Sequence, residues 1–282
     1  VIGAHTVNSS VSIGIVTSSH ADGDVETVLR DADIAMYEAK RAGRGRYVMF
    51  EPFMHKRARD NVALENDLRQ ALDNEEFSLH FQPRLNARTR RVQGAEALLR
   101  WKNPLLGQVA PSHFIPLAEE TGLIKPIGLW VLREACAQWV ALQAQGLCLG
   151  VELSVNLSVA QLADPELVEQ LREVLQASGL EPHLLELELT ESTLMDNPVA
   201  AQAQVSALKG LGVQIAIDDF GTGYSSLAYL KRFEIDKLKV DQSFVYGMLD
   251  DSADAAIVHA VIALGHTLGL KVVAEGVENL PT

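Results

Sequence analysis

Short apolar segments alternate with longer amphipathic ones along the chain from residue 77 onward. The short segments are rich in Val, Ile and Leu and have the length of buried strands, whereas the longer ones repeat apolar residues at helical spacing. Strands are expected over residues 77–82, 92–100, 150–156, 184–190, 213–218, 237–240 and 271–274. Helices are expected over residues 126–145, 166–178, 199–211, 225–233 and 253–268.

This alternation predicts βαβ units and a parallel sheet, so the fold class is α/β. Seven strands in one series favour a (β/α)8 barrel resembling a TIM barrel over an open doubly wound sheet. No Gly-x-Gly-x-x-Gly motif opens the first unit, which argues against a dinucleotide-binding fold. Only residues 83–91 join the first two strands, too few for a helical crossover, so the first strand is expected to be antiparallel to the second.

The first 75 residues have a different pattern. A strand over 11–16, a helix over 24–41 and a strand over 47–50 are expected, followed by a strongly charged helix over 51–75. About 50 residues with so few elements are too small to count as a free-standing domain. We therefore expect a fragment at 1–50, a linker helix at 51–75 and the main domain at 76–282.

Composition and charge narrow the class of protein. The formal net charge of −13 argues against binding polymeric DNA or RNA, but it allows a small anionic ligand where metal ions offset the repulsion. Cys136 and Cys148 indicate no disulfide framework, and no apolar run approaches the roughly 20 residues of a membrane span, so a cytoplasmic location is expected. The chain starts at Val1, without Met, which suggests a piece of a longer protein; any tether to the inner membrane is expected only in segments upstream.

Polar side chains stand at or just beyond the ends of most predicted strands, where barrels of this kind carry their chemistry. An acid that follows a strand more commonly caps the next helix, but polar residues at so many successive strand ends favour a shared site. The polar residues are Glu96, Asn156, Glu188, Glu191, Asp218, Asp219, Lys239, Asp241, Glu275 and Glu278.

Carboxylates and one Asn amide are ligands for Mg²⁺ or Mn²⁺, whereas the eight His show no His-Glu-x-x-His spacing that would indicate zinc. A ring of carboxylates with one lysine fits two-metal hydrolysis of a phosphodiester. Lys239 would orient the attacking water, and Glu275 is the candidate general base. Strand alternation would point Asp218 and Asp219 to opposite sides, so at least Asp219 is expected where the strand has begun to turn.

The segment Glu96-Ala97-Leu98-Leu99-Arg100-Trp101 resembles the signature of EAL-domain phosphodiesterases, the hydrolases of the bacterial messenger cyclic di-GMP. The resemblance covers about residues 60–280, and further motifs follow in family order. They are Phe81-Gln82-Pro83, Asn156-Leu157-Ser158, Glu188-Leu189-Thr190-Glu191-Ser192, the run 218–227, Lys239-Val240-Asp241 and Ala274-Glu275-Gly276-Val277-Glu278.

This resemblance implies the opening of one phosphodiester of cyclic di-GMP to give linear pGpG, with two Mg²⁺ or Mn²⁺ ions, in a domain that commonly forms homodimers. It implies five metal ligands: Glu96, Asn156, Glu188, Asp218 and Asp219. It gives Lys239 and Glu275 the catalytic roles named above, and Gln82 and Arg100 contacts with the phosphate or a guanine. Supporting roles fall to Glu191, which would hold the mobile loop 220–227 and link metal binding to the dimer contact, to Asp241 at the metals and to Glu278 beside Glu275.

The first 50 residues resemble the tail of a GGDEF diguanylate cyclase domain, through Val11-Ser12-Ile13-Gly14, the run 32–40 and Gly43-Arg44-Gly45-Arg46. The Gly-Gly-Asp-Glu-Phe loop itself is absent, so no cyclase activity is expected. EAL domains continue through a further helix and an eighth strand, which predicts a barrel truncated before its last βα unit and an isolated fragment that could be inactive. Two alternatives stay open: a non-catalytic cyclic di-GMP-binding module and a regulatory dimerisation module.

Overall fold

The computed structural model describes residues 10–17, 24–41, 45–222 and 230–277. By its contacts the chain divides into two compact units, Val1–Arg69 and Gln70–Thr282. No helix in the described ranges is long and apolar enough to cross a membrane.

The first unit contains β1 (Ile13–Ile15), α1 (Val25–Arg41), β2 (Tyr47–Met49) and most of α2 (Phe53–Ala71). The elements follow the predicted order, and β1 pairs in parallel with β2. Ala35, Phe50 and Met54 form a small core, because the apolar stripe of α1 turns toward the strands. Gly14 permits this packing, since a Cβ there would lie 1.9 Å from the Ala32 carbonyl oxygen.

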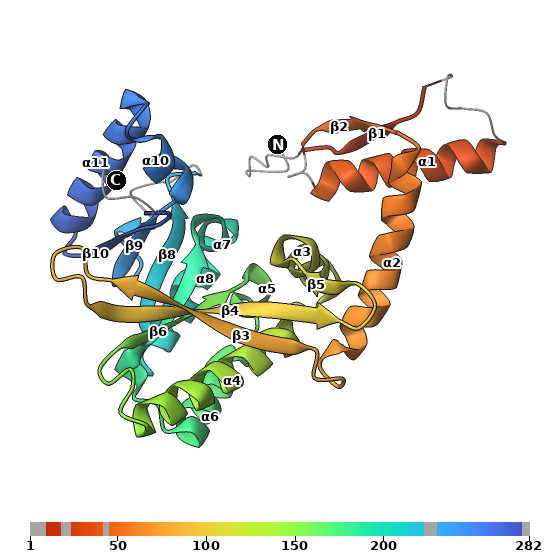
Figure 1. Ribbon diagram of the computed structural model, residues 1–282. Coiled ribbons are helices and arrows are strands. Elements are labelled where there is room, and N and C mark those ends of the chain that lie inside the picture. Colours follow the sequence, from red (N-terminus) through yellow and green to blue (C-terminus); the bar gives the residue numbers. More distant parts are fainter. Residues whose placement is uncertain (1–9, 18–23, 42–44, 223–229, 278–282) are drawn as a thin grey trace. The chain divides into compact units, whose positions relative to one another are not determined.

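The second unit is built on one sheet whose strands follow the order β10-β9-β8-β7-β6-β4-β3 (Figure 1). The antiparallel pairing of β3 with β4 confirms the prediction from the short connection between them. The other pairs along this path are parallel, as βαβ units require. The strands are β3 (Phe77–Leu85), β4 (Val92–Asn103), β6 (Glu152–Leu157), β7 (Leu185–Thr190), β8 (Gln214–Phe220), β9 (Lys237–Val240) and β10 (Lys271–Ala274).

Helices cover the outer face of this sheet: α4 packs against β6 and β3, α8 against β8, and α11 against β9 and β10. The helices are α3 (Pro111–Thr121), α4 (Ile124–Ala144), α5 (Val159–Leu162), α6 (Leu167–Ser178), α7 (Glu191–Asp196), α8 (Pro198–Lys209), α10 (Gln242–Gly247) and α11 (Ser252–Thr267), with a 3-10 turn at Pro182–Leu184. The α/β sheet with an antiparallel first strand confirms the predicted TIM-like fold class.

Several elements were not predicted: the short strand β5 (Gly107–Val109), which pairs with β4, and the helices α3, α5, α7 and α10. The expected strand 213–218 extends further, to Phe220. The helix expected over 225–233 falls largely on residues outside the described ranges.

Strand alternation determines which side chains lie on the face toward the helices and which lie on the inner, concave face of the sheet. In β7 the side chains of Leu185, Leu187 and Leu189 are fully buried on the face toward the helices. Glu186 and Glu188 lie on the opposite face and are also buried. Curvature of the sheet therefore encloses a polar interior, and the charged side chains within it form the site described next.

Candidate active site

Five of the predicted site residues are brought together on the interior face of neighbouring strands. Glu96 comes from β4, Asn156 from β6, Glu188 from β7, Asp218 from β8 and Lys239 from β9. The parallel register places Asn156 directly beside Glu188 and Thr190 beside Asp218. Because the strands run in the same direction, their carboxyl ends meet at one rim of the sheet.

Lys239 is the centre of this group and is almost completely buried. Its Nζ lies 2.6 Å from Glu188 Oε2, 2.7 Å from Glu275 Oε1 and 3.1 Å from Asp218 Oδ1. A fourth carboxylate oxygen, Glu96 Oε2, lies 3.5 Å away. Asn156 Nδ2 donates to the other oxygen of Glu96 at 2.7 Å. Four carboxylates thus share one ammonium group.

A bulge in β8 places Asp219 on the same side as its neighbour. Asp219 has a left-handed backbone with φ of 53°, and the register with β9 shifts between Ile217 and Phe220. The Asp219 amide donates to Asp218 Oδ1 at 2.9 Å. One oxygen from each of Asp218, Asp219 and Glu275 then lies within 4.8 Å of the other two. The departure from alternation expected at Asp219 is therefore a bulge inside the strand, not a turn after it.

Crowding of like charges shifts the ionisation of these groups. Burial, helped by Asp218 and Asp241, raises the pKa of Asp219 to about 6. Burial also raises the pKa of Glu188 and of Glu275, although Lys239 opposes both shifts. For Lys239 itself burial would lower the pKa, but the surrounding carboxylates outweigh burial and raise it. The lysine is thus held protonated among acids that still carry excess negative charge.

The group fits divalent cations. Its donors are carboxylate oxygens and one amide oxygen, the ligands that Mg²⁺ and Mn²⁺ prefer. Five acids, Glu96, Glu188, Asp218, Asp219 and Glu275, face the single ammonium of Lys239 at this rim. Additional positive charge is needed to stabilise all of them in the ionised state.

The largest share of the chain matches a known protein family. Residues 65–280, which are more than half of the chain, match the family model of the EAL domain. The chain belongs to the EAL family. Residues 2–46 match a second model, "Diguanylate cyclase, GGDEF domain", so both resemblances noted in the sequence are confirmed.

Relatives of this EAL protein include two curated bacterial proteins. It is 48% identical over 281 residues to the "Bifunctional diguanylate cyclase/cyclic di-GMP phosphodiesterase MucR" of Pseudomonas aeruginosa, covering 99% of this chain and 40% of the relative. It is 41% identical over 278 residues to the "Cyclic di-GMP phosphodiesterase PdeR" of Escherichia coli, covering 99% of this chain and 42% of the relative. The chain therefore spans less than half the length of these relatives.

A solved structure described as "PaMucR Phosphodiesterase, c-di-GMP complex" superposes with a TM-score of 0.75 and 49% sequence identity. The match covers 78% of this chain and 88% of that one.

Two further predicted residues of the EAL domain, Glu191 and Asp241, contact residues next to this rim or within it. Glu191, buried at the start of α7, accepts a hydrogen bond from the Gly221 amide at 3.2 Å. Gly221 has φ of 104°, a conformation that favours glycine. Asp241 caps α10 by accepting from the Ser243 amide at 2.9 Å, and its carboxylate is near enough to Asp219 to raise the pKa of that side chain. Residues 223–227 of the predicted loop, and Glu278, lie outside the described residues.

The two predicted substrate contacts lie on β3 and β4. Gln82 is exposed and pairs in register with Glu96. Arg100 lies four residues beyond Glu96 on the same strand face, and its guanidinium donates to the Leu99 carbonyl at 2.9 Å. Neither residue is among the ion-pair partners of Lys239 in the described part of the chain.

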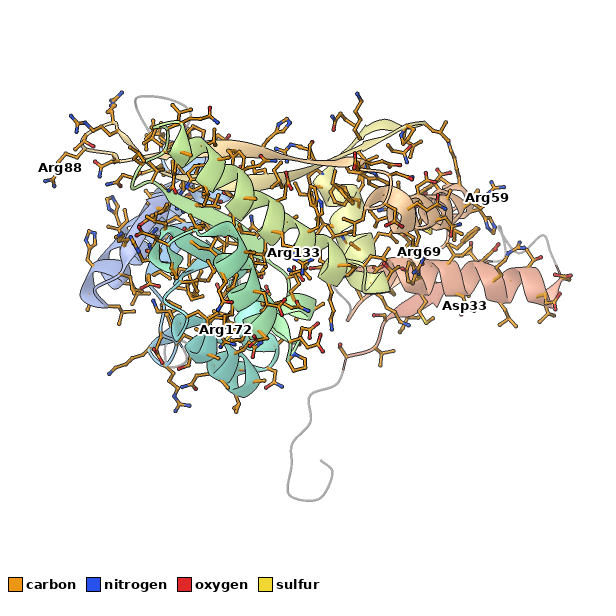
Figure 2. The ribbon with its side chains drawn as sticks, turned by 90° about the horizontal axis from the view of Figure 1, so that it is seen from below. Asp33, Arg59, Arg69, Arg88, Arg133 and Arg172 are labelled. Atoms are coloured by element: carbon orange, nitrogen blue, oxygen red, sulfur yellow. The ribbon has the colours of Figure 1, made fainter. Side chains whose placement is uncertain are left out.

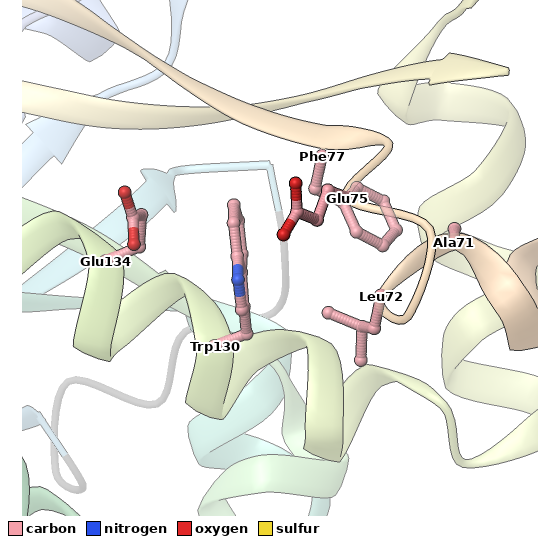
Figure 3. A pocket seen from close by; sticks show the side chains of 6 residues that line it. All are labelled: Ala71, Leu72, Glu75, Phe77, Trp130 and Glu134. Atoms are coloured by element: carbon pink, nitrogen blue, oxygen red, sulfur yellow. The ribbon is translucent and has the colours of Figure 1, made fainter.

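A separate pocket of about 270 Å³ lies near the start of β3. Trp130 stands between Glu75 and Glu134 on its wall, and Phe77 and Leu72 complete an apolar side (Figure 3). None of the predicted metal ligands lines this pocket, so we assign the chemistry to the acidic rim instead.

Sequence reasoning missed two cations of the interior, Arg84 and Lys237, of which Arg84 contacts a rim acid. Arg84, near the end of β3, forms ion pairs with Glu186 and Glu188, the latter at 3.2 Å. The available signal was its position two residues after Gln82, which places it on the same strand face. Arg84 pairs in register with Gly94 of β4, so it lies below the rim, toward the opposite end of the interior.

Proposed function

We propose that this EAL domain hydrolyses cyclic di-GMP to linear pGpG with two Mg²⁺ or Mn²⁺ ions. The observation that carries the proposal is the buried ammonium of Lys239 among four carboxylates at the carboxyl rim of the sheet. The names of two relatives and the cyclic di-GMP complex of a 49% identical structure support the choice of substrate.

The proposed metal ligands are Glu96, Asn156, Glu188, Asp218 and Asp219, which come from four strands that are neighbours in the sheet. When bound, divalent cations neutralise the phosphodiester and lower the pKa of water. Asp241 is proposed to support this group as a further negative charge beside Asp219. Glu191 holds the start of the loop after β8 through Gly221, and Glu278 is proposed to support Glu275.

Glu275 is the proposed general base. Its carboxylate lies 2.7 Å from Lys239 Nζ, and burial raises its pKa, which makes it a better proton acceptor near neutral pH. Lys239, protonated, donates a hydrogen bond to the attacking water but cannot take its proton. Glu275 takes a proton from the attacking water, whose oxygen bonds to phosphorus. The bond from phosphorus to one ribose oxygen breaks, and that oxygen receives a proton from solvent water. Gln82 and Arg100 are proposed to contact the phosphate or a guanine.

Assembly and location belong to the same proposal. We infer a homodimer of EAL domains acting in the cytoplasm, with residues 1–50 as a GGDEF fragment and 51–75 as a linker helix to the EAL domain at 76–282. Light scattering of the purified chain with and without Mn²⁺ tests the dimer. A monomer under both conditions would refute the dimer and leave the site assignment intact.

The decisive experiment incubates the purified chain with cyclic di-GMP and Mn²⁺ and separates the products. We expect pGpG from the wild type and a loss of about 10²–10⁴-fold in Glu275→Gln, the usual cost of removing a general base. Glu96→Ala should also lose activity, through loss of a metal ligand. Glu169→Gln, at an exposed position on α6, is the matched control and should retain activity. Tight binding of cyclic di-GMP without turnover by the wild type would favour the non-catalytic binding module.

A further inference from the structure

A second layer of buried charges lies beneath the acidic rim. Lys237, the inward-facing residue of β9 before Lys239, forms ion pairs with Glu152 and Glu186. Arg84 also pairs with Glu186, and its Nη2 lies 3.8 Å from Glu152. Neutral groups complete the layer, because Ser154 Oγ donates to Glu186 at 2.8 Å and Gln214 Nε2 donates to Glu152 at 3.1 Å.

This lower layer is balanced in charge, whereas the rim is not. Two carboxylates, Glu152 and Glu186, face two cations, Arg84 and Lys237. Lys271, largely exposed, adds a third cation 3.2 Å from Glu152. At the rim five acids face one lysine. The lower layer therefore needs no metal ion to neutralise it, and its side chains are fixed by contacts within the chain.

Arg84 joins the two layers. Its Nη1 contacts Glu186 Oε1 in the lower layer and lies 3.2 Å from Glu188 Oε1 at the rim. The other oxygen of Glu188, Oε2, accepts from Lys239 at 2.6 Å. Each oxygen of this one carboxylate is thus held by a different cation, one from β3 and one from β9. Such double contact fixes both the position and the plane of the carboxylate.

The neighbouring strand leaves room for this guanidinium. Gly94 of β4 pairs in register with Arg84. A Cβ at Gly94 would lie 2.7 Å from Arg84 Nη2 and 2.9 Å from its Nε, closer than side-chain contacts allow. Because the guanidinium is tied to buried glutamates, it could not move aside without losing those contacts. The glycine thus makes the path of Arg84 to Glu188 possible.

We propose that Arg84 is a positioning residue that holds the carboxylate of Glu188 in the orientation in which it binds metal. This inference rests on the metal site of the proposed function. Partners that orient a metal ligand typically contribute 10–100-fold to metal affinity. A purely electrostatic role for Arg84 would have the opposite sign, because removing a nearby positive charge strengthens cation binding.

The test measures Mn²⁺ affinity of the full chain, from the electron paramagnetic resonance signal of free Mn²⁺, together with the thermal unfolding midpoint. Arg84→Met should weaken Mn²⁺ binding about tenfold or more. Arg84→Lys keeps the charge but not the planar fork, so it should restore the unfolding midpoint without restoring the affinity. Arg88→Met is the control, since Arg88 projects from the hairpin between β3 and β4 (Figure 2) and should bind Mn²⁺ like the wild type.

Gly94→Ala provides a variant that keeps every charge and displaces the guanidinium, and it should also bind Mn²⁺ about tenfold more weakly. Unchanged or tighter binding in Arg84→Met overturns the inference; if that variant does not fold, unchanged binding in Gly94→Ala overturns it. A wild type that binds no Mn²⁺ refutes the proposed metal site itself. A wild type and variants that bind equally refute only the role of Arg84.

Discussion

Replacing Lys239 by Met should destabilise the metal-free protein strongly, because it removes the one ammonium shared by four carboxylates. Removing one partner of a buried ion pair costs about 3–5 kcal/mol, since the remaining charge stays buried without compensation. The side chain of Lys239 is 1% exposed and that of Glu188 is fully buried, so solvent screens Glu188 poorly once the ammonium is gone. Lys125→Met is the matched control. Its side chain is 47% exposed and its Nζ lies 3.0 Å from Asp164 Oδ2, a surface pair expected to contribute about 0–1 kcal/mol.

Urea unfolding in EDTA at pH 7.5, followed by tryptophan fluorescence, measures this difference. All three tryptophans, Trp101, Trp130 and Trp139, belong to the unit Gln70–Thr282, so the signal reports on the barrel. Mn²⁺ should recover part of the lost stability, because divalent ions supply positive charge to the same acids. If Lys239→Met costs no more than Lys125→Met in EDTA, the acids neutralise themselves by protonation, and the reading of Lys239 as the charge centre is wrong.

Three further results are expected. In EDTA the free energy of unfolding should fall as pH rises from 4 to 6. The pKa of Asp219 is raised from 3.8 to about 6 in the folded state, so ionisation of this carboxyl over that range costs stability. Asp219→Asn should make the fall smaller, and an unchanged slope would contradict the raised pKa of Asp219. Burial would raise the pKa of Glu152, but Lys237 and Gln214 outweigh burial and lower that pKa to about 2. Glu152→Gln should therefore reduce the free energy of unfolding at pH 6, and reduce it progressively less as pH drops below 4.5, as urea unfolding at each pH would show. Glu191→Ala should lower the rate of pGpG formation about tenfold, because it releases the Gly221 amide, whereas Glu181→Ala, on the exposed surface, should not lower it. Equal rates would refute the role of Glu191 in holding the loop after β8, and unchanged light scattering would show that a loss of rate is not a loss of the dimer.

The alternation of strands and helices could be predicted because short runs of Val, Ile and Leu differ clearly from the longer segments with helical spacing. The antiparallel start followed from the length of one connection, which leaves no room for a crossover helix. The helix α3 was missed because Pro116 lies inside it, and proline in a helix interior normally argues against a helix. The strand β5 is three residues long and includes Gly107, so it carries too little pattern to be recognised.

The rim acids could be predicted because each lies within or just after a strand rich in apolar residues, but their mutual geometry could not. Alternation places Asp218 and Asp219 on opposite faces, and only the left-handed backbone at Asp219 returns its carboxylate to the group. A bulge depends on the register between β8 and β9, which is a tertiary property. The sequence therefore predicted which residues meet at the rim, while the backbone conformation determines how they meet.

The sequence of β7 shows most clearly where prediction from pattern ends. Alternating Leu and Glu in residues 185–189 is typical of a strand with one face in water, yet both Glu186 and Glu188 are buried by the curvature of the sheet. The two acids have the same strand face and the same neighbours in sequence, so alternation cannot distinguish them. Their partners do, because Glu186 shares two cations, Arg84 and Lys237, with Glu152, whereas Glu188 shares Lys239 with three other acids. Which acid is balanced by cations and which is left with excess negative charge around it thus depends on cations from β3 and β9, and these are assigned only once the strand order is known.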